Sequence, residues 1–293
     1  MSMRLGLAGD LIPRDPAALT PTLVGELAGQ GITAIVTHFQ TPPEVLAGGL
    51  GRRVQEMLAE AGLGIVQATG YNPNLVHQDR DLRQLELKRL RAAFQAAHTL
   101  GAEMIITGCG SHHPTFFYGP AAKNHLPQTR KRLIESLRSA ASMAEEVGVL
   151  LALECHVLTT LDTAEHIQDI LQAVDSPWVR VNFDPVNLIG DLSTLYANGD
   201  AMRRVATLLA PFYAPCAHVK DIAPQPELVL HLAEVPPGEG LLDYEAFFSI
   251  CRQLGDGTAL VVEHLPAEQT PQALDFVRQA ATRYGIELAQ PIR

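Results

Sequence analysis

Short apolar runs alternate along the chain with longer segments in which apolar residues recur at helical spacing. The apolar runs cover residues 4–10, 33–38, 63–70, 102–108, 149–156, 179–184, 217–221 and 258–264. Runs of this length that are flanked by Gly, Pro or Asp are typical of strands buried on both faces of a parallel sheet. The pattern therefore predicts eight strands.

The intervening segments have the pattern of amphipathic helices. Residues 80–100 and 128–148 place Leu, Phe and Ala side chains along one face, which predicts a helix in each segment. Asp162 and Asp243 are candidate N-caps for helices over 163–174 and 244–254, because an Asp side chain there accepts backbone N–H groups. Glycines that suit helix ends follow several of these segments: Gly31, Gly62, Gly101, Gly148 and Gly255.

Eight strands that alternate with helices predict a single (β/α)8 TIM barrel over residues 1–293, an α/β fold with its active site at the carboxyl ends of the strands. A doubly wound sheet is the competing architecture, and it would require a glycine-rich phosphate loop after the first strand. Residues 6–9, Gly-Leu-Ala-Gly, match that loop poorly. The longest irregular segments, 109–126 and 222–242, follow strands and are expected at the active face.

Composition and charge narrow the range of functions. Apolar residues make up 47% of the 293 residues and charged residues 18%, which excludes a disordered chain. The net charge of −10 argues against a nucleic acid partner, because phosphate binding depends largely on Lys and Arg. The four cysteines form no CxxC pair, and no apolar stretch suits a signal peptide or a membrane span. We therefore expect a cytoplasmic protein with no membrane partner, and the sequence leaves open whether it forms a homo-oligomer.

Ionisable residues gather where the later strands end. Glu154, Asp184, His218 and Glu263 lie 30, 34 and 45 residues apart, which is close to the length of one strand, helix and loop in a barrel. The last interval is longer by about the length of the 222–242 segment. The spacing therefore predicts four side chains that project from four consecutive strands into one mouth.

Three carboxylates and one imidazole in one mouth form a ligand set for a divalent metal ion. A carboxylate inside an apolar barrel is costly unless a positive charge offsets it, and one cation would do so. Oxygen-rich ligation with one nitrogen favours Mn²⁺ first, with Mg²⁺, Co²⁺ or Zn²⁺ as the other candidates. The competing interpretation is four separate polar residues that cap neighbouring helices or pair with Arg and Lys.

Five segments carry a family resemblance: Leu-Ala-Leu-Glu-Cys-His at 151–156, Val-Asn-Phe-Asp-Pro-Val-Asn at 181–187, Ala-His-Val-Lys-Asp at 217–221, Pro-Gly-Glu-Gly-Leu-Leu-Asp at 237–243 and Leu-Val-Val-Glu at 260–263. In these the chain resembles the xylose-isomerase-like TIM-barrel superfamily of sugar (phosphate) isomerases and epimerases. The resemblance implies that Glu154, Asp184, His218 and Glu263 hold the metal. It also implies that Glu154 and Glu263 are the catalytic acid/base pair.

The resemblance implies an isomerase or epimerase that acts on a small ketose or a related polyhydroxy carbonyl compound. Proton transfer by the two glutamates would pass through an enediolate that the metal stabilises. The same site would support a lyase or dehydratase on a keto-sugar or keto-inositol, and this is the alternative hypothesis. An apurinic endonuclease is disfavoured by the net charge and by Asn187 at a position where that branch has His. A non-catalytic carbohydrate-binding barrel is disfavoured by the two glutamates.

Five residues are candidates for contact with a small carbohydrate substrate: His38, His112, His156, Asn187 and Lys220. His156 and Lys220 each lie two residues after a predicted ligand, so a regular strand would place each on the same face as that ligand. Asn187 would bond a substrate hydroxyl or stabilise a turn. His38 follows the second strand, and His112 lies in the loop after the fourth.

Overall fold

The computed structural model describes residues 1–291 and contains eight parallel strands that close into a barrel. The strands are β1 (Ser2–Gly9), β2 (Ala34–His38), β3 (Gly64–Thr69), β4 (Met104–Thr107), β5 (Leu150–Leu153), β6 (Val179–Phe183), β7 (Tyr213–Val219) and β10 (Ala259–Leu265). Each pairs with the next in chain order, and β10 pairs with β1 from Arg4 opposite Ala259 to Leu7 opposite Val262. The predicted TIM barrel is therefore confirmed.

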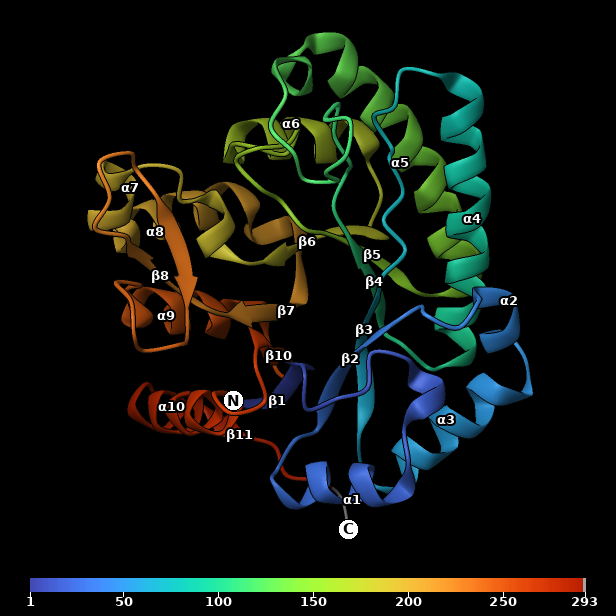
Figure 1. Ribbon diagram of the computed structural model, residues 1–293, viewed down its shortest axis with the longest axis vertical. Coiled ribbons are helices and arrows are strands. Elements are labelled where there is room, and N and C mark those ends of the chain that lie inside the picture. The colour runs from blue at the N-terminus through green and yellow to red at the C-terminus, as the bar shows by residue number, and fades with distance from the viewer. Residues whose placement is uncertain (292–293) are drawn as a thin grey trace.

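Ten helices surround the barrel within the described residues, and Figure 1 shows them as a ring outside the strands. They are α1 (Pro21–Gly29), α2 (Pro43–Leu46), α3 (Gly49–Glu60), α4 (Arg80–Thr99), α5 (Pro127–Val147), α6 (Ala164–Val174), α7 (Leu192–Tyr196), α8 (Asn198–Leu209), α9 (Tyr244–Leu254) and α10 (Thr270–Arg283). The helices predicted over 80–100, 128–148, 163–174 and 244–254 are confirmed. No helix in residues 1–291 is long and apolar enough to cross a membrane.

Two separate apolar cores result from the alternation of side chains along the strands. A small core inside the barrel contains Ala8, Val36, Met104, Ala152 and Val261 among others. A much larger core lies between the strands and the helices and includes most of the buried Leu, Ile and Phe side chains. Polar side chains at inward positions are therefore placed inside the barrel rather than against the helices.

Two differences from the sequence prediction concern where β7 and α6 begin. β7 begins at Tyr213 rather than at residue 217. Pro215 lies in the added part, where the pairing with β6 shifts register, and a proline in the sequence argues against a strand. The N-cap of α6 is Thr163, whose side chain accepts the N–H of His166, so the predicted cap at Asp162 is wrong. Asp243 caps α9 as predicted, and accepts the N–H of Ala246.

The segment 222–242 is not wholly irregular. It contains an antiparallel hairpin in which β8 (Asp221–Pro224) pairs with β9 (Leu232–Val235). A further short strand, β11 (Glu287–Leu288), pairs with the beginning of β1. The hairpin starts two residues after β7 and therefore lies at the carboxyl end of the barrel, where it brings Glu234 to the ionisable cluster.

Candidate metal centre

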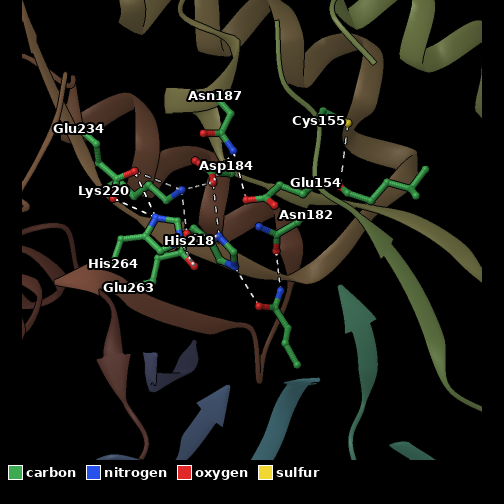
Figure 2. Close-up of polar contacts among 12 residues, drawn as sticks. Glu154, Cys155, Asn182, Asp184, Asn187, His218, Lys220, Glu234, Glu263 and His264 are labelled. Carbon is green, nitrogen blue, oxygen red and sulfur yellow. Dashed lines mark hydrogen bonds and ion pairs between the residues drawn. The ribbon is translucent and has the colours of Figure 1, made fainter. Parts of the chain in front are cut away.

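Four strands place Glu154, Asp184, His218 and Glu263 at the mouth of the barrel. Glu154 directly follows β5, Asp184 directly follows β6, and His218 and Glu263 lie near the ends of β7 and β10. Each residue offers one ligand atom, and these atoms all lie within 4.8 Å of one another. The structure thus brings together all four residues that the sequence predicts as ligands, and Figure 2 shows their side chains converging.

Three buried atoms in this cluster have no hydrogen-bond partner within residues 1–291: Asp184 Oδ1, His218 Nδ1 and Glu263 Oε1. His218 Nδ1 is 2.6 Å from Glu263 Oε1 and 3.4 Å from Asp184 Oδ2, but neither approach has the angles of a hydrogen bond. Buried polar atoms normally have partners. When His218 is neutral, its Nδ1 lone pair converges with these carboxylate oxygens, so this donor set fits a divalent metal ion.

Lys220 is buried within the same cluster and is only 2% exposed. Its Nζ lies 2.8 Å from Asp184 Oδ2 and 2.8 Å from Glu263 Oε1, with Glu234 Oε2 3.6 Å away (Figure 2). Burial alone lowers the pKa of a lysine, but the surrounding carboxylates raise the pKa of Lys220 well above its usual value. Three ligand carboxylates and one ammonium leave a net charge of −2, which one divalent cation would balance.

Electrostatic coupling also shifts the pKa values of the ligands. Burial lowers the pKa of His218, but the charge of Glu263 and a contact with Asp184 outweigh burial and raise it to about 10. Burial raises the pKa of Glu263, whereas His218 and Lys220 bring it well below its usual value. The pKa of Asp184 is lowered against burial by Lys220 and His218. The carboxylates are therefore ionised at neutral pH, and His218 carries a proton that a metal must displace.

Two amide side chains lie inside the barrel beside His218. The Nε2 atom of His218 lies 2.9 Å from Gln67 Oε1, and Gln67 Nε2 donates to Asn182 Oδ1 at 2.9 Å. Gln67 belongs to β3 and Asn182 to β6, so the bonds connect three strands. All three side chains are buried, and Nδ2 of Asn182 has no partner within the described chain.

A cavity of about 570 Å³ opens beside the cluster. Glu154, His218 and Glu263 line it together with Arg14, His38, Gln67, Asn72, Tyr118 and His264, among others. Tyr118 donates its hydroxyl to Glu154 Oε2. Burial and the charge of Glu154 raise the pKa of the Tyr118 phenol, so the phenol stays protonated as a donor. The volume lies in the range of about 300–1,000 Å³ that is usual for small-molecule sites.

The predicted substrate contacts occupy different places. His38 lines the cavity. Asn187 donates to Asp184 Oδ2 at 2.9 Å and approaches Glu154 Oε1 at 3.4 Å, and Lys220 contacts the ligand carboxylates rather than the cavity. Among the described residues 1–291, neither His112 nor His156 lines the cavity. The Nε2 atom of His112 instead forms a hydrogen bond with the hydroxyl of Thr129.

The strand argument for His156 is wrong, because β5 ends at Leu153 and His156 lies in the loop beyond it. The ring Nδ1 of His156 accepts the N–H of Leu158, which stabilises a turn. Lys220 also lies just beyond its strand, since β7 ends at Val219. A substrate role for each of these residues stays a prediction.

Sequence reasoning missed four polar residues around the cluster: Gln67, Tyr118, Asn182 and Glu234. Gln67 and Asn182 could have been noticed, because each is an amide inside an otherwise apolar strand run, and such a residue needs a buried partner. Tyr118 lies in the segment 109–126, which was expected at the active face, but no pattern singled out its phenol as a partner of Glu154. Glu234 lies in a segment that was expected to be irregular, so its approach to Lys220 had no signal in the sequence.

The sequence profile described as xylose isomerase-like TIM barrel matches residues 25–280. The chain belongs to the xylose isomerase-like TIM barrel family. One curated relative is the L-ribulose-5-phosphate 3-epimerase UlaE of Shigella flexneri, which is 26% identical over 219 residues and spans 72% of this chain and 69% of the relative.

Solved members of the xylose isomerase-like fold superpose along nearly the whole chain. The 3-keto-D-glucoside 4-epimerase YcjR of E. coli has a TM-score of 0.69 at 18% identity, and covers 96% of this chain and 100% of its own. A xylose isomerase-like TIM barrel protein from Mycobacterium smegmatis in complex with magnesium has a TM-score of 0.66 at 17% identity, with coverage of 95% and 97%. At these identities the likeness establishes the fold alone.

Proposed function

We propose that this protein is a divalent-metal-dependent sugar epimerase or isomerase that acts on a small ketose or a related polyhydroxy carbonyl compound. The observation that carries the proposal is the placement of Glu154 and Glu263. They approach one cavity from β5 and β10, and they converge with the buried side chains of Asp184 and His218. The epimerases among the relatives support the same reaction class.

Residues Glu154, Asp184, His218 and Glu263 would hold the metal, with Mn²⁺ as the first candidate. A divalent cation in this site would stabilise negative charge that develops on substrate oxygens during deprotonation. The net charge of −2 contributed by the three carboxylates and Lys220 matches a divalent ion. We also propose that residues 1–293 form one catalytic domain, and that it works in the cytoplasm, where its four buried cysteines would stay reduced.

The two glutamates would transfer the proton. A C–H next to a carbonyl breaks when one carboxylate takes the proton, and its electron pair forms the enediolate. The other glutamate would take up a proton from solvent and would deliver it to the opposite face, which inverts the carbon. Tyr118 and Asn187 both contact Glu154 and would keep its carboxylate in one orientation. His38 at the cavity wall would contact substrate hydroxyls, and substrate roles for Asn187, Lys220, His156 and His112 are further proposals.

Turnover in D₂O tests the proposal. The full chain with Mn²⁺ is incubated with a panel of free and phosphorylated ketoses and 3-keto-glucosides, and products are followed by NMR. We expect deuterium on the carbon next to the carbonyl, together with an epimer or isomer. Loss of water would identify the lyase alternative, and conversion without deuterium would replace the two-glutamate mechanism by hydride transfer between carbons. No conversion of any compound would contradict the proposal.

A further inference from the structure

The amide pair inside the barrel determines which nitrogen of His218 faces the carboxylates. Nε2 of His218 faces Gln67 Oε1 at 2.9 Å, and Nδ1 on the other side of the ring faces Glu263 Oε1 at 2.6 Å. A neutral imidazole has one N–H and one lone pair, so a bond from Nε2–H leaves the lone pair on Nδ1. The lone pair then lies among the ligand oxygens.

Gln67 alone could not impose this choice. A glutamine amide has a carbonyl end and an NH₂ end, and it could present either to the histidine. In the structure the Oδ1 atom of Asn182 accepts a hydrogen bond from Gln67 Nε2 at 2.9 Å, so Asn182 occupies the NH₂ end of Gln67. The carbonyl end of Gln67 is therefore left for His218. A reversed amide would present N–H groups to Nε2 and require the proton on Nδ1, where it would exclude a cation.

We propose that Gln67, oriented by Asn182, is a positioning residue that keeps the proton of His218 on Nε2 and so reserves Nδ1 for the metal. The inference rests on the proposed metal centre and adds residues outside its ligand set. The three side chains are at most 3% exposed, so the bonds among them are largely shielded from water. Their strands are β3, β6 and β7, which makes the arrangement a property of the closed barrel.

A packing role is the competing explanation. Gln67 Nε2 also lies 3.9 Å from the sulfur of Met104, so the amide fills space in the inner core. The two explanations make opposite predictions for two variants. Gln67→Leu preserves most of the volume and removes the acceptor, whereas Gln67→Glu preserves the acceptor and buries a charge. A packing residue would tolerate Leu better, and a positioning residue would tolerate Glu better.

Metal titration of the full-length chain, with Mn²⁺ followed by calorimetry, is the first test. We expect Gln67→Leu to weaken binding by roughly 10–100-fold, the usual effect of removing a partner of a ligating histidine. Gln67→Glu should bind at least as tightly as the parent chain. Asn182→Leu should weaken binding, and Asn182→Asp, which keeps the acceptor, should not. Asn198→Leu is the matched control, since that buried amide bonds the backbone of Leu195, Leu241 and Asp243 and no candidate ligand side chain.

NMR of the parent chain tests the tautomer without any variant. With ¹⁵N-labelled histidine and ¹¹³Cd²⁺ as the probe, we expect cadmium coupling to Nδ1 of His218 and a slowly exchanging proton on Nε2. Coupling to Nε2, or unchanged affinity in Gln67→Leu, would overturn the inference. If Asp184→Ala loses the metal while Gln67→Leu keeps it, the inference fails and the metal centre stands. If the parent chain binds no divalent ion, both fail.

Discussion

At the scale of single residues, Asp184 connects most of the groups in the cluster. It accepts a hydrogen bond from Asn187, contacts Lys220 and His218, and has one oxygen without a partner in the described chain. Asn187 donates a hydrogen bond to this carboxylate, whereas Lys220 places a positive charge beside it. Substitutions here and at Lys220 therefore separate metal binding from chemistry.

We expect Asp184→Asn to lose the metal ion while keeping the fold. The amide has nearly the shape of the carboxylate, but it removes one of the three charges that hold the cation. Elemental analysis of protein purified without chelator should find about one equivalent in the parent chain and almost none in the variant. Asp191→Asn, at the exposed cap of α7, is the control. Full occupancy in Asp184→Asn would show that the ligand set is wrong.

Lys220→Met should retain the metal and lose turnover. Removing the ammonium makes the cluster more negative, which favours a cation, but it also removes the group that neutralises charge beside the reacting centre. We expect the affinity for Mn²⁺ to be equal or higher. We expect kcat/KM to fall at least about tenfold, because removing one group that stabilises charge in a transition state commonly costs that much or more. Unchanged kcat/KM would leave Lys220 a purely structural role.

Metal affinity should increase with pH. Asp184 and Glu263 have lowered pKa values and are ionised at neutral pH, whereas the pKa of His218 is raised to about 10, so a metal must displace its proton. Below that pKa, one proton released per ion gives roughly a tenfold gain in affinity per pH unit. Calorimetry in buffers of different ionisation enthalpy measures the proton released. Affinity that is constant between pH 6 and 8 would contradict this expectation.

At the scale of elements, the conformation of the loop after β4 depends on Gly108, the residue that directly follows the strand. A Cβ on Gly108 would overlap Cε1 of Tyr118 and lie 3.0 Å from Cε1 of Phe117, so the Tyr118 ring occupies the space that a side chain would need. This close approach is what lets Tyr118 reach Glu154. The identity of one backbone position thus controls a contact in the proposed active site.

Gly108→Ala should displace the Tyr118 ring and lower kcat by about tenfold or more, with metal binding preserved, since small misplacements of catalytic groups are costly. Gly64→Ala is a matched control, because a Cβ at that position meets no atom within 4 Å. Tyr118→Phe should reproduce the kinetic effect. Tyr71→Phe, which removes a similar phenol–carboxylate bond to Glu86, should not. Equal rates in the two glycine variants would argue against a role for the loop.

At the scale of the whole molecule, the sequence predicted the order of the strands and the convergence of Glu154, Asp184, His218 and Glu263, because both follow from local patterns. An apolar run predicts a strand, and an ionisable residue at its end is visible without knowledge of neighbours. Contacts among distant strands have no such signal: the bonds from His218 to Gln67 and on to Asn182 depend on barrel closure. The hairpin of β8 and β9 was missed because polar and proline residues obscure its short strands.

The cavity wall draws on both halves of the chain, whereas the four candidate ligands all come from the second half. The ligands follow or lie in β5, β6, β7 and β10, whereas much of the cavity wall comes from β1, β2 and β3, with Arg14, His38 and Asn72 among its residues. Recognition and chemistry can therefore diversify separately during evolution. Exchange of Arg14, His38 and Asn72 between relatives would then change which compound enters, while Gln67 and the four candidate ligands stay in place.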